Sequence, residues 1–180
     1  MIQPAAGIVV WLGASMVVVG DGRRGLAAGI ALSTLGLAVL AFVNAGPVAA
    51  AAIAAGGVTA AARRSVTGPA GWEVLAPGST PRLVLCIATA LVAFWIADAV
   101  TAGPVASLRF ALMTGIALSA ARVLSTAEPA AQLSASAVVA LCAASVGAIG
   151  SSQPGVWPYV VGGLVAALLG WIPTRSPIAA

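Results

Sequence analysis

The sequence contains no lysine and no histidine, and only 7% of its 180 residues are charged. Without lysine the chain has no amine for a Schiff base. Without histidine it has no Ser-His triad, no bis-histidine haem site and no histidine-containing metal site. We therefore expect this chain alone to be no enzyme and to hold no cofactor and no metal.

Cysteine is also scarce. Cys86 and Cys142 are the only two, and each lies inside an apolar run without a nearby second cysteine. This placement excludes a disulfide framework and is typical of buried thiols that act as small apolar groups.

Apolar residues are what the sequence has in excess: 61% of the chain is hydrophobic, and the mean hydropathy is +1.11. A hydrocarbon core about 30 Å thick requires about 20 apolar residues in a helix, and seven runs near that length follow one another. The runs are 4–20, 25–43, 46–62, 83–101, 105–124, 131–149 and 157–172. The sequence therefore predicts an all-α fold, a polytopic transmembrane bundle of about seven helices in a single integral membrane domain over residues 1–180.

Most connectors between these runs are short and contain turn residues. Asp21, in Val19-Gly20-Asp21-Gly22, is predicted to be a turn residue. The one long connector, 65–81, is rich in proline and glycine and is not expected to be regular helix throughout. Its Trp72, with the adjacent Glu73, is the predicted contact for a partner, although Trp72 resting on the membrane interface explains the residue equally well.

Connector arginines all fall on one side of the predicted bundle. They are Arg23, Arg24, Arg63, Arg64, Arg82, Arg122 and Arg175. The positive-inside rule then places the N-terminus outside and the C-terminus in the cytoplasm, with 65–81 as a cytoplasmic loop. This topology accounts for the net charge of +4, so we do not expect nucleic-acid binding. The abundance of Ala, Gly, Val and Arg is typical of a GC-rich genome and favours a bacterial plasma (inner) membrane.

A short motif occurs twice. Ala45-Gly46-Pro47-Val48-Ala49 recurs as Ala102-Gly103-Pro104-Val105-Ala106, and the run after each copy ends in Ala-Ala-Arg. A duplication would give one leading helix followed by three two-helix hairpins. In a chain so rich in alanine the match also arises easily by chance, and both interpretations stay open.

Small residues at four-residue spacing indicate where helices pack closely. The pairs are Gly25 with Gly29, Ala52 with Gly56, and Gly163 with Ala167. We expect these stripes to pack mainly within the chain, while a self-association face is the alternative.

Two charges fall inside the apolar runs. Asp98 lies five residues before Gly103 and Arg109 five after Pro104, so a hairpin places the two side chains at similar depth. We predict an intramembrane ion pair there, either as a structural contact or as a binding point for a proton or an anion.

Two functions of different class remain. The first is a non-catalytic membrane subunit or scaffold that packs with partner membrane proteins or with itself in the lipid bilayer. The second is a permease or channel for a small solute. Its polar lining would be Asp98, Arg109, Asn44, Gln132, Ser134 and Ser136.

Overall fold

The computed structural model describes residues 2–68, 70–74, 79–100, 103, 105–150 and 155–174. These residues form seven α-helices and one short π-helix. The helices are α1 (Ile2–Val19), α2 (Arg23–Ala45), α3 (Pro47–Val66), α4 (Thr80–Trp95), the π-helical η1 (Ile96–Val100), α5 (Ala106–Ser125), α6 (Pro129–Gly150) and α7 (Trp157–Trp171).

Each predicted apolar run is confirmed as a helix, with ends that differ by a few residues. Five described helices are long and apolar enough to cross a membrane, which fits a membrane protein. They are Ile2–Val19, Arg23–Ala45, Thr80–Asp98, Ala106–Ser125 and Pro129–Ile149. α7 is a shorter apolar helix of 15 residues. The sequence did not predict η1, where the backbone widens from an α-helix to a π-helix around Asp98.

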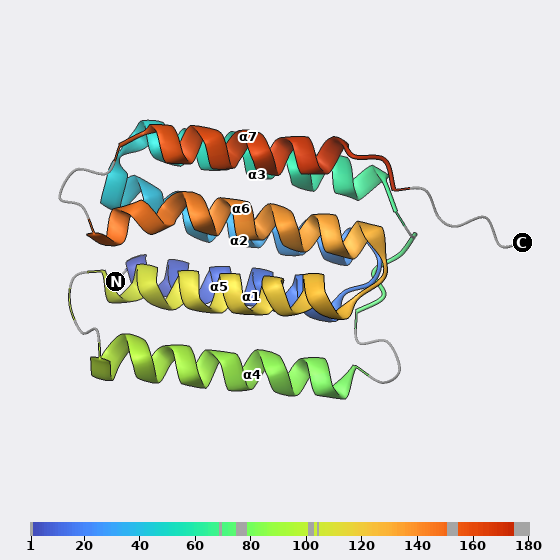
Figure 1. Ribbon diagram of the computed structural model, residues 1–180, viewed down its shortest axis with the longest axis horizontal. Coiled ribbons are helices and arrows are strands. Elements are labelled where there is room, and N and C mark those ends of the chain that lie inside the picture. Colours follow the sequence, from blue (N-terminus) through green and yellow to red (C-terminus); the bar gives the residue numbers. More distant parts are fainter. Residues whose placement is uncertain are drawn as a thin grey trace, which may run out of the picture.

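The helices form two packed layers, one in front of the other in Figure 1. α1, α2 and α3 make one layer, and α5, α6 and α7 make the other. Across the layers α1 packs on α5, α2 on α6 and α3 on α7. The core between them is built from alanine, valine and leucine side chains such as Val10, Leu37 and Leu141, which are fully buried.

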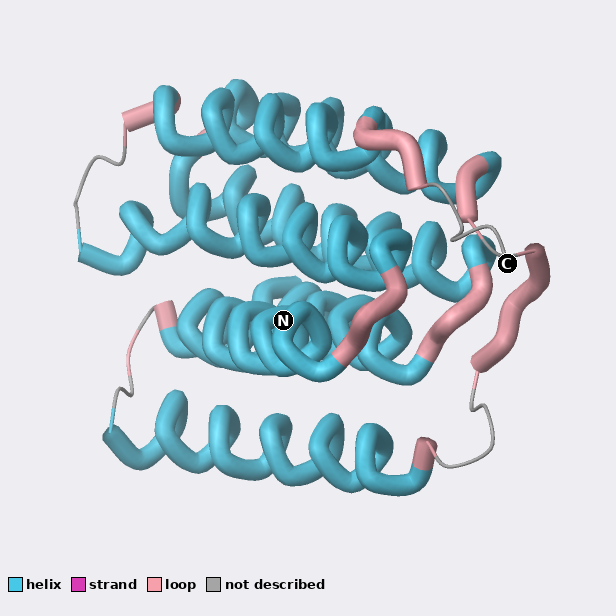
Figure 2. Tube along the Cα trace, turned by 45° about the vertical axis from the view of Figure 1, so that its right-hand side comes forward, coloured by secondary structure: helices cyan, strands magenta, loops and turns pink. Residues whose placement is uncertain are grey.

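α4 stands at the edge of this bundle, next to α5 and α1 (Figures 1 and 2). Most of its large side chains are exposed, including Leu91, Phe94 and Trp95. Whereas α2 packs extensively on α3, α4 makes few contacts with α5. α4 thus stands apart from two groups of three helices. The two hairpins that share the repeated motif, α2 with α3 and α4 with α5, therefore pack differently. Whether the motif reflects duplication stays a prediction.

The turn between α2 and α3 shows why the repeated motif contains glycine followed by proline. Gly46 is the one residue between the two helices and has φ 91°, which L-residues with a side chain rarely adopt. Pro47 begins α3, where its missing N–H costs nothing. Gly103 also has positive φ, while Ala102 and Pro104 lie outside the described residues.

The small-residue stripes pack within the chain, as expected. A Cβ on Gly163 of α7 would lie 2.5 Å from the carbonyl oxygen of Ala52 on α3. A Cβ on Gly29 of α2 would lie 2.8 Å from the carbonyl oxygen of Gly13 on α1. Gly25 faces the loop instead, where its Cβ would lie 2.7 Å from the carbonyl oxygen of Trp72. These contacts leave no room for a side chain and allow the backbones to approach closely.

Candidate functional site

Most of the charged residues that the structure describes lie at one end of the bundle. Because successive helices alternate in direction, the end of α1, both ends of the 67–79 connector and the end of α5 all meet there. Six arginines lie at this end: Arg23, Arg24, Arg63, Arg64, Arg82 and Arg122. The six arginines therefore share one end of the bundle, as predicted, while the side of a membrane that this end faces stays a prediction. Arg175 lies outside the described residues.

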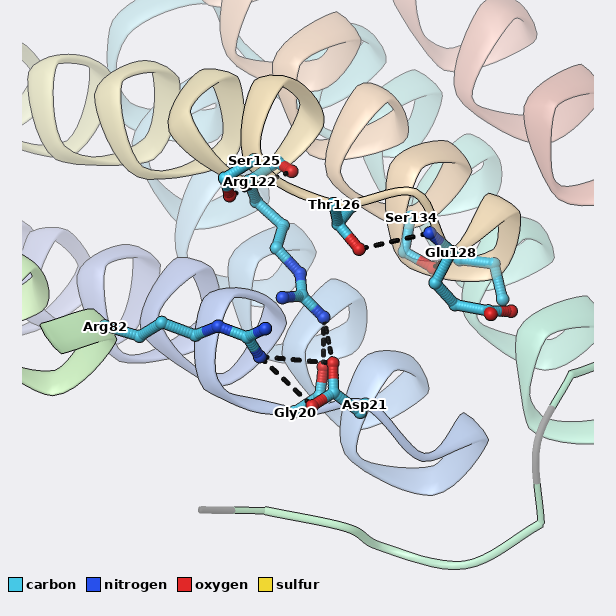
Figure 3. Close-up of polar contacts among 9 residues, drawn as sticks. Gly20, Asp21, Arg82, Arg122, Ser125, Thr126, Glu128 and Ser134 are labelled. Atoms are coloured by element: carbon cyan, nitrogen blue, oxygen red, sulfur yellow. Dashed lines mark hydrogen bonds and ion pairs between the residues drawn. The ribbon is translucent and has the colours of Figure 1, made fainter. Parts of the chain in front are cut away.

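Asp21 lies at the centre of a cluster of hydrogen bonds and ion pairs at this end (Figure 3). Arg82, from the first turn of α4, donates through Nη1 to both carboxylate oxygens, at 3.0 and 3.2 Å. Arg122, from the end of α5, donates through Nη2 to Asp21 Oδ1 and to the carbonyl oxygen of Gly20. One carboxylate thus joins the α1–α2 turn to α4 and α5, so Asp21 is more than the turn residue that the sequence predicted.

Burial differs sharply among the members of this ion cluster. The Arg122 side chain is 1% exposed, whereas Asp21 is 29% and Arg82 36% exposed. A buried guanidinium is costly to desolvate, so the Asp21 carboxylate is needed mainly to compensate Arg122. The pair between Asp21 and Arg82 is closer to a surface ion pair, which contributes little.

A further arginine contacts the end of another helix. Arg63 of α3 lies 4.0 Å above the ring of Trp171, the last residue of α7. The adjacent Arg64 is also buried, at 1% exposed. The contact of Arg63 joins α3 to α7 at the arginine-rich end, as Asp21 joins the α1–α2 turn to α4 and α5.

Residues 70–74 of the long connector lie against the α1–α2 turn. The backbone N–H of Asp21 donates to the carbonyl of Glu73, and the N–H of Arg24 donates to that of Gly71, each at 3.1 Å. The loop approaches so closely that a Cβ on Gly22 would lie 2.5 Å from the oxygen of Gly71. Glu73 has φ 34°, a strained value for a residue with a side chain.

This docked loop presents Trp72 to the outside. The residue is 54% exposed, although its neighbours are held by the two backbone hydrogen bonds. The predicted contact residue is therefore an aromatic side chain on a fixed backbone. Neither the contact with a partner nor the role of Glu73 is tested by this geometry, and both stay predictions.

Asp98 and Arg109 lie at the opposite end of α4 and α5 and line two different cavities. Arg109 lines a groove of about 760 Å³ between α4, α5 and α6. Asp98, in η1, is exposed and lines a smaller cavity of about 230 Å³ that also contains Ile8 of α1 and Phe110 of α5. The ion pair between the two residues stays a prediction.

The other predicted polar lining residues bond mostly to nearby backbone. Asn44 donates to the carbonyl of Leu40, Ser134 to that of Ala130, and Gln132 to that of Thr126, all within 2.7 Å. Ser136 is partly buried on the same helix as Ser134. Amide and hydroxyl groups that bond to nearby backbone in this way are less available to line a polar path.

Cys86 and Cys142 are buried free thiols, as the sequence predicted. The backbone of Cys86 has a second role, because its carbonyl accepts a hydrogen bond from the indole nitrogen of Trp11 at 3.1 Å. This bond joins α4 to α1. Within the described ranges no group of three or more His, Cys, Asp or Glu side chains is placed to hold a metal ion.

Comparison with known proteins found no matching family model, no similar curated protein and no similar solved structure.

Proposed function

We propose that the chain is a non-catalytic integral membrane protein, a subunit or scaffold that packs with partner membrane proteins in a larger assembly. In this proposal all seven helices cross a bacterial inner membrane, with the N-terminus outside and the arginine-rich end in the cytoplasm. The five helices of spanning length support a membrane protein, and the collection of six arginines at one end supports a cytoplasmic position for that end.

Trp72 is the observation that carries the proposal. An exposed indole loses little conformational entropy on binding when its backbone is already fixed, and tryptophan is enriched among the residues that dominate interfaces. The backbone bonds at Gly71 and Glu73 provide that fixed position. The loop lies at the polar end of the bundle, where a partner can reach it.

A permease or channel is supported less well. A solute path requires polar groups that face a common space through the bundle. The buried hydroxyls of Thr34, Thr114, Ser134 and Ser145 instead donate to carbonyls three or four residues earlier in their own helices. The two cavities that contain charged residues lie beside α4, at the edge of the bundle.

Affinity purification of the tagged chain from its native membranes, with mild cross-linking, tests the proposal. We expect at least one membrane protein to co-purify, and we expect Trp72→Ala to reduce its recovery strongly. Trp157→Ala is the matched control, because Trp157 is 77% exposed at the other end of the bundle. Recovery that is unchanged by Trp72→Ala in a folded chain, or the absence of any co-purifying membrane protein, would overturn the proposal.

A further inference from the structure

The groove between α4, α5 and α6 combines an apolar wall with a single charge. α5 forms its floor through Leu112 and Ile116, and Val92 of α4 and Ile149 of α6 face it from the two sides. Arg109 is the one charged residue among the described residues that line it. Because Arg109 lies in the first turn of α5, the charge is at the end of the groove nearest the membrane surface.

The shape of the groove suits an acyl chain that lies along α5. From Arg109 to Ala117 the floor spans eight rises of the helix, which is about 12 Å at 1.5 Å per residue. The groove is open along the side of the bundle and has a volume of about 760 Å³, so one acyl chain can lie along the apolar floor with its headgroup next to the Arg109 end.

We infer that this groove binds an anionic phospholipid, with one acyl chain along the floor and the phosphate headgroup at Arg109. The acyl chain moves from the apolar bilayer into an apolar groove, so its burial contributes little to the preference for one lipid over another. The headgroup contact therefore decides which lipid binds. A partly buried guanidinium donates charge-assisted hydrogen bonds to phosphate oxygens and attracts a net negative headgroup most strongly. This inference is independent of any protein partner.

Native mass spectrometry of the purified chain tests this inference directly. The protein is reconstituted with phosphatidylglycerol or phosphatidylcholine of identical acyl chains, and the bound lipid is counted. We expect the wild-type chain to prefer phosphatidylglycerol and Arg109→Gln to reduce that preference roughly fivefold, which corresponds to about 1 kcal/mol per basic residue near a lipid surface. Arg109→Lys keeps the charge and should retain most of the preference.

Two controls make the result specific to the groove. Arg24→Gln removes the same charge from an exposed site at the opposite end, where it measures the general attraction of surface arginines for anionic lipid, and it should reduce the preference less than Arg109→Gln does. Ala117→Phe fills the groove from an exposed position of α5 and should reduce binding of both lipids, while Ala51→Phe, on the exposed face of α3, should not. A preference that survives Arg109→Gln, falls equally with Arg24→Gln, or is insensitive to Ala117→Phe would overturn the inference. So would seating of a partner protein, rather than lipid, at the groove in a cross-linking experiment.

Discussion

At the scale of single residues, Asp21 joins three parts of the chain. Its carboxylate receives hydrogen bonds from α4 and from α5, and its backbone N–H donates to the carbonyl of Glu73 in the loop. Its partners Arg82 and Arg122 lie 61 and 101 residues away in the sequence. A local pattern cannot show such a contact, which is why the sequence indicated only a turn residue. The available signal was a lone acid at a helix end on the arginine-rich side.

The unequal burial of its partners gives an ordered set of mutational effects. Asp21→Asn and Arg122→Gln should each lower the free energy of unfolding by about 1–3 kcal/mol, below the 3–5 kcal/mol estimated for fully buried pairs because Asp21 is partly exposed. Arg82→Gln should cost at most about 1 kcal/mol, as exposed pairs do. Thermal unfolding in detergent measures all three.

Arg24→Gln is the control for the loss of one positive charge at the same end of the bundle, since the Arg24 side chain is exposed. If Arg122→Gln were no more destabilising than Arg24→Gln, Asp21 would not be compensating a buried charge, and the ordering above would be wrong.

At the scale of secondary structure elements, the apolar runs were sufficient to locate every described α-helix. Their length and the Gly, Pro and Asp residues between them are local properties, so they can be read from sequence. The position of α4 outside the two layers could not be predicted, because its hydropathy resembles that of helices that are well packed. The separation of Asp98 and Arg109 into two cavities likewise depends on how α4 and η1 meet α5, which spacing along the chain does not determine.

The contact between α3 and α7 tests the role of small residues in this bundle. A Cβ on Gly56 would collide with the backbone of Gly163, so Gly56→Ala should lower the free energy of unfolding by about 1–3 kcal/mol. In the helix α6, Gly147→Ala meets nothing within 4 Å and should be neutral or stabilise the chain by up to about 1 kcal/mol through helix propensity. Comparison of the two variants by thermal unfolding separates close packing from a general effect of alanine. Equal stability of the two variants would show that the helices can separate without cost.

At the scale of the whole molecule, charge divides the bundle into two unlike ends. One end carries the six arginines together with Asp21, Glu73 and Glu128, and the docked loop exposes Trp72 there. At the other end, Arg109 and Asp98 are the charged groups of the described residues. This division places the proposed protein contact and the proposed lipid contact on opposite sides of the membrane.

Reporter fusions along the chain test this arrangement most directly, because both proposed contacts depend on which end faces the cytoplasm. Fusions after Val66 and after Thr126 should report the cytoplasm, and fusions after Asn44, Thr101 and Ser152 should report the outside, since every connector arginine then lies on the cytoplasmic side. A single connector on the opposite face would contradict the seven-helix topology with its N-terminus outside.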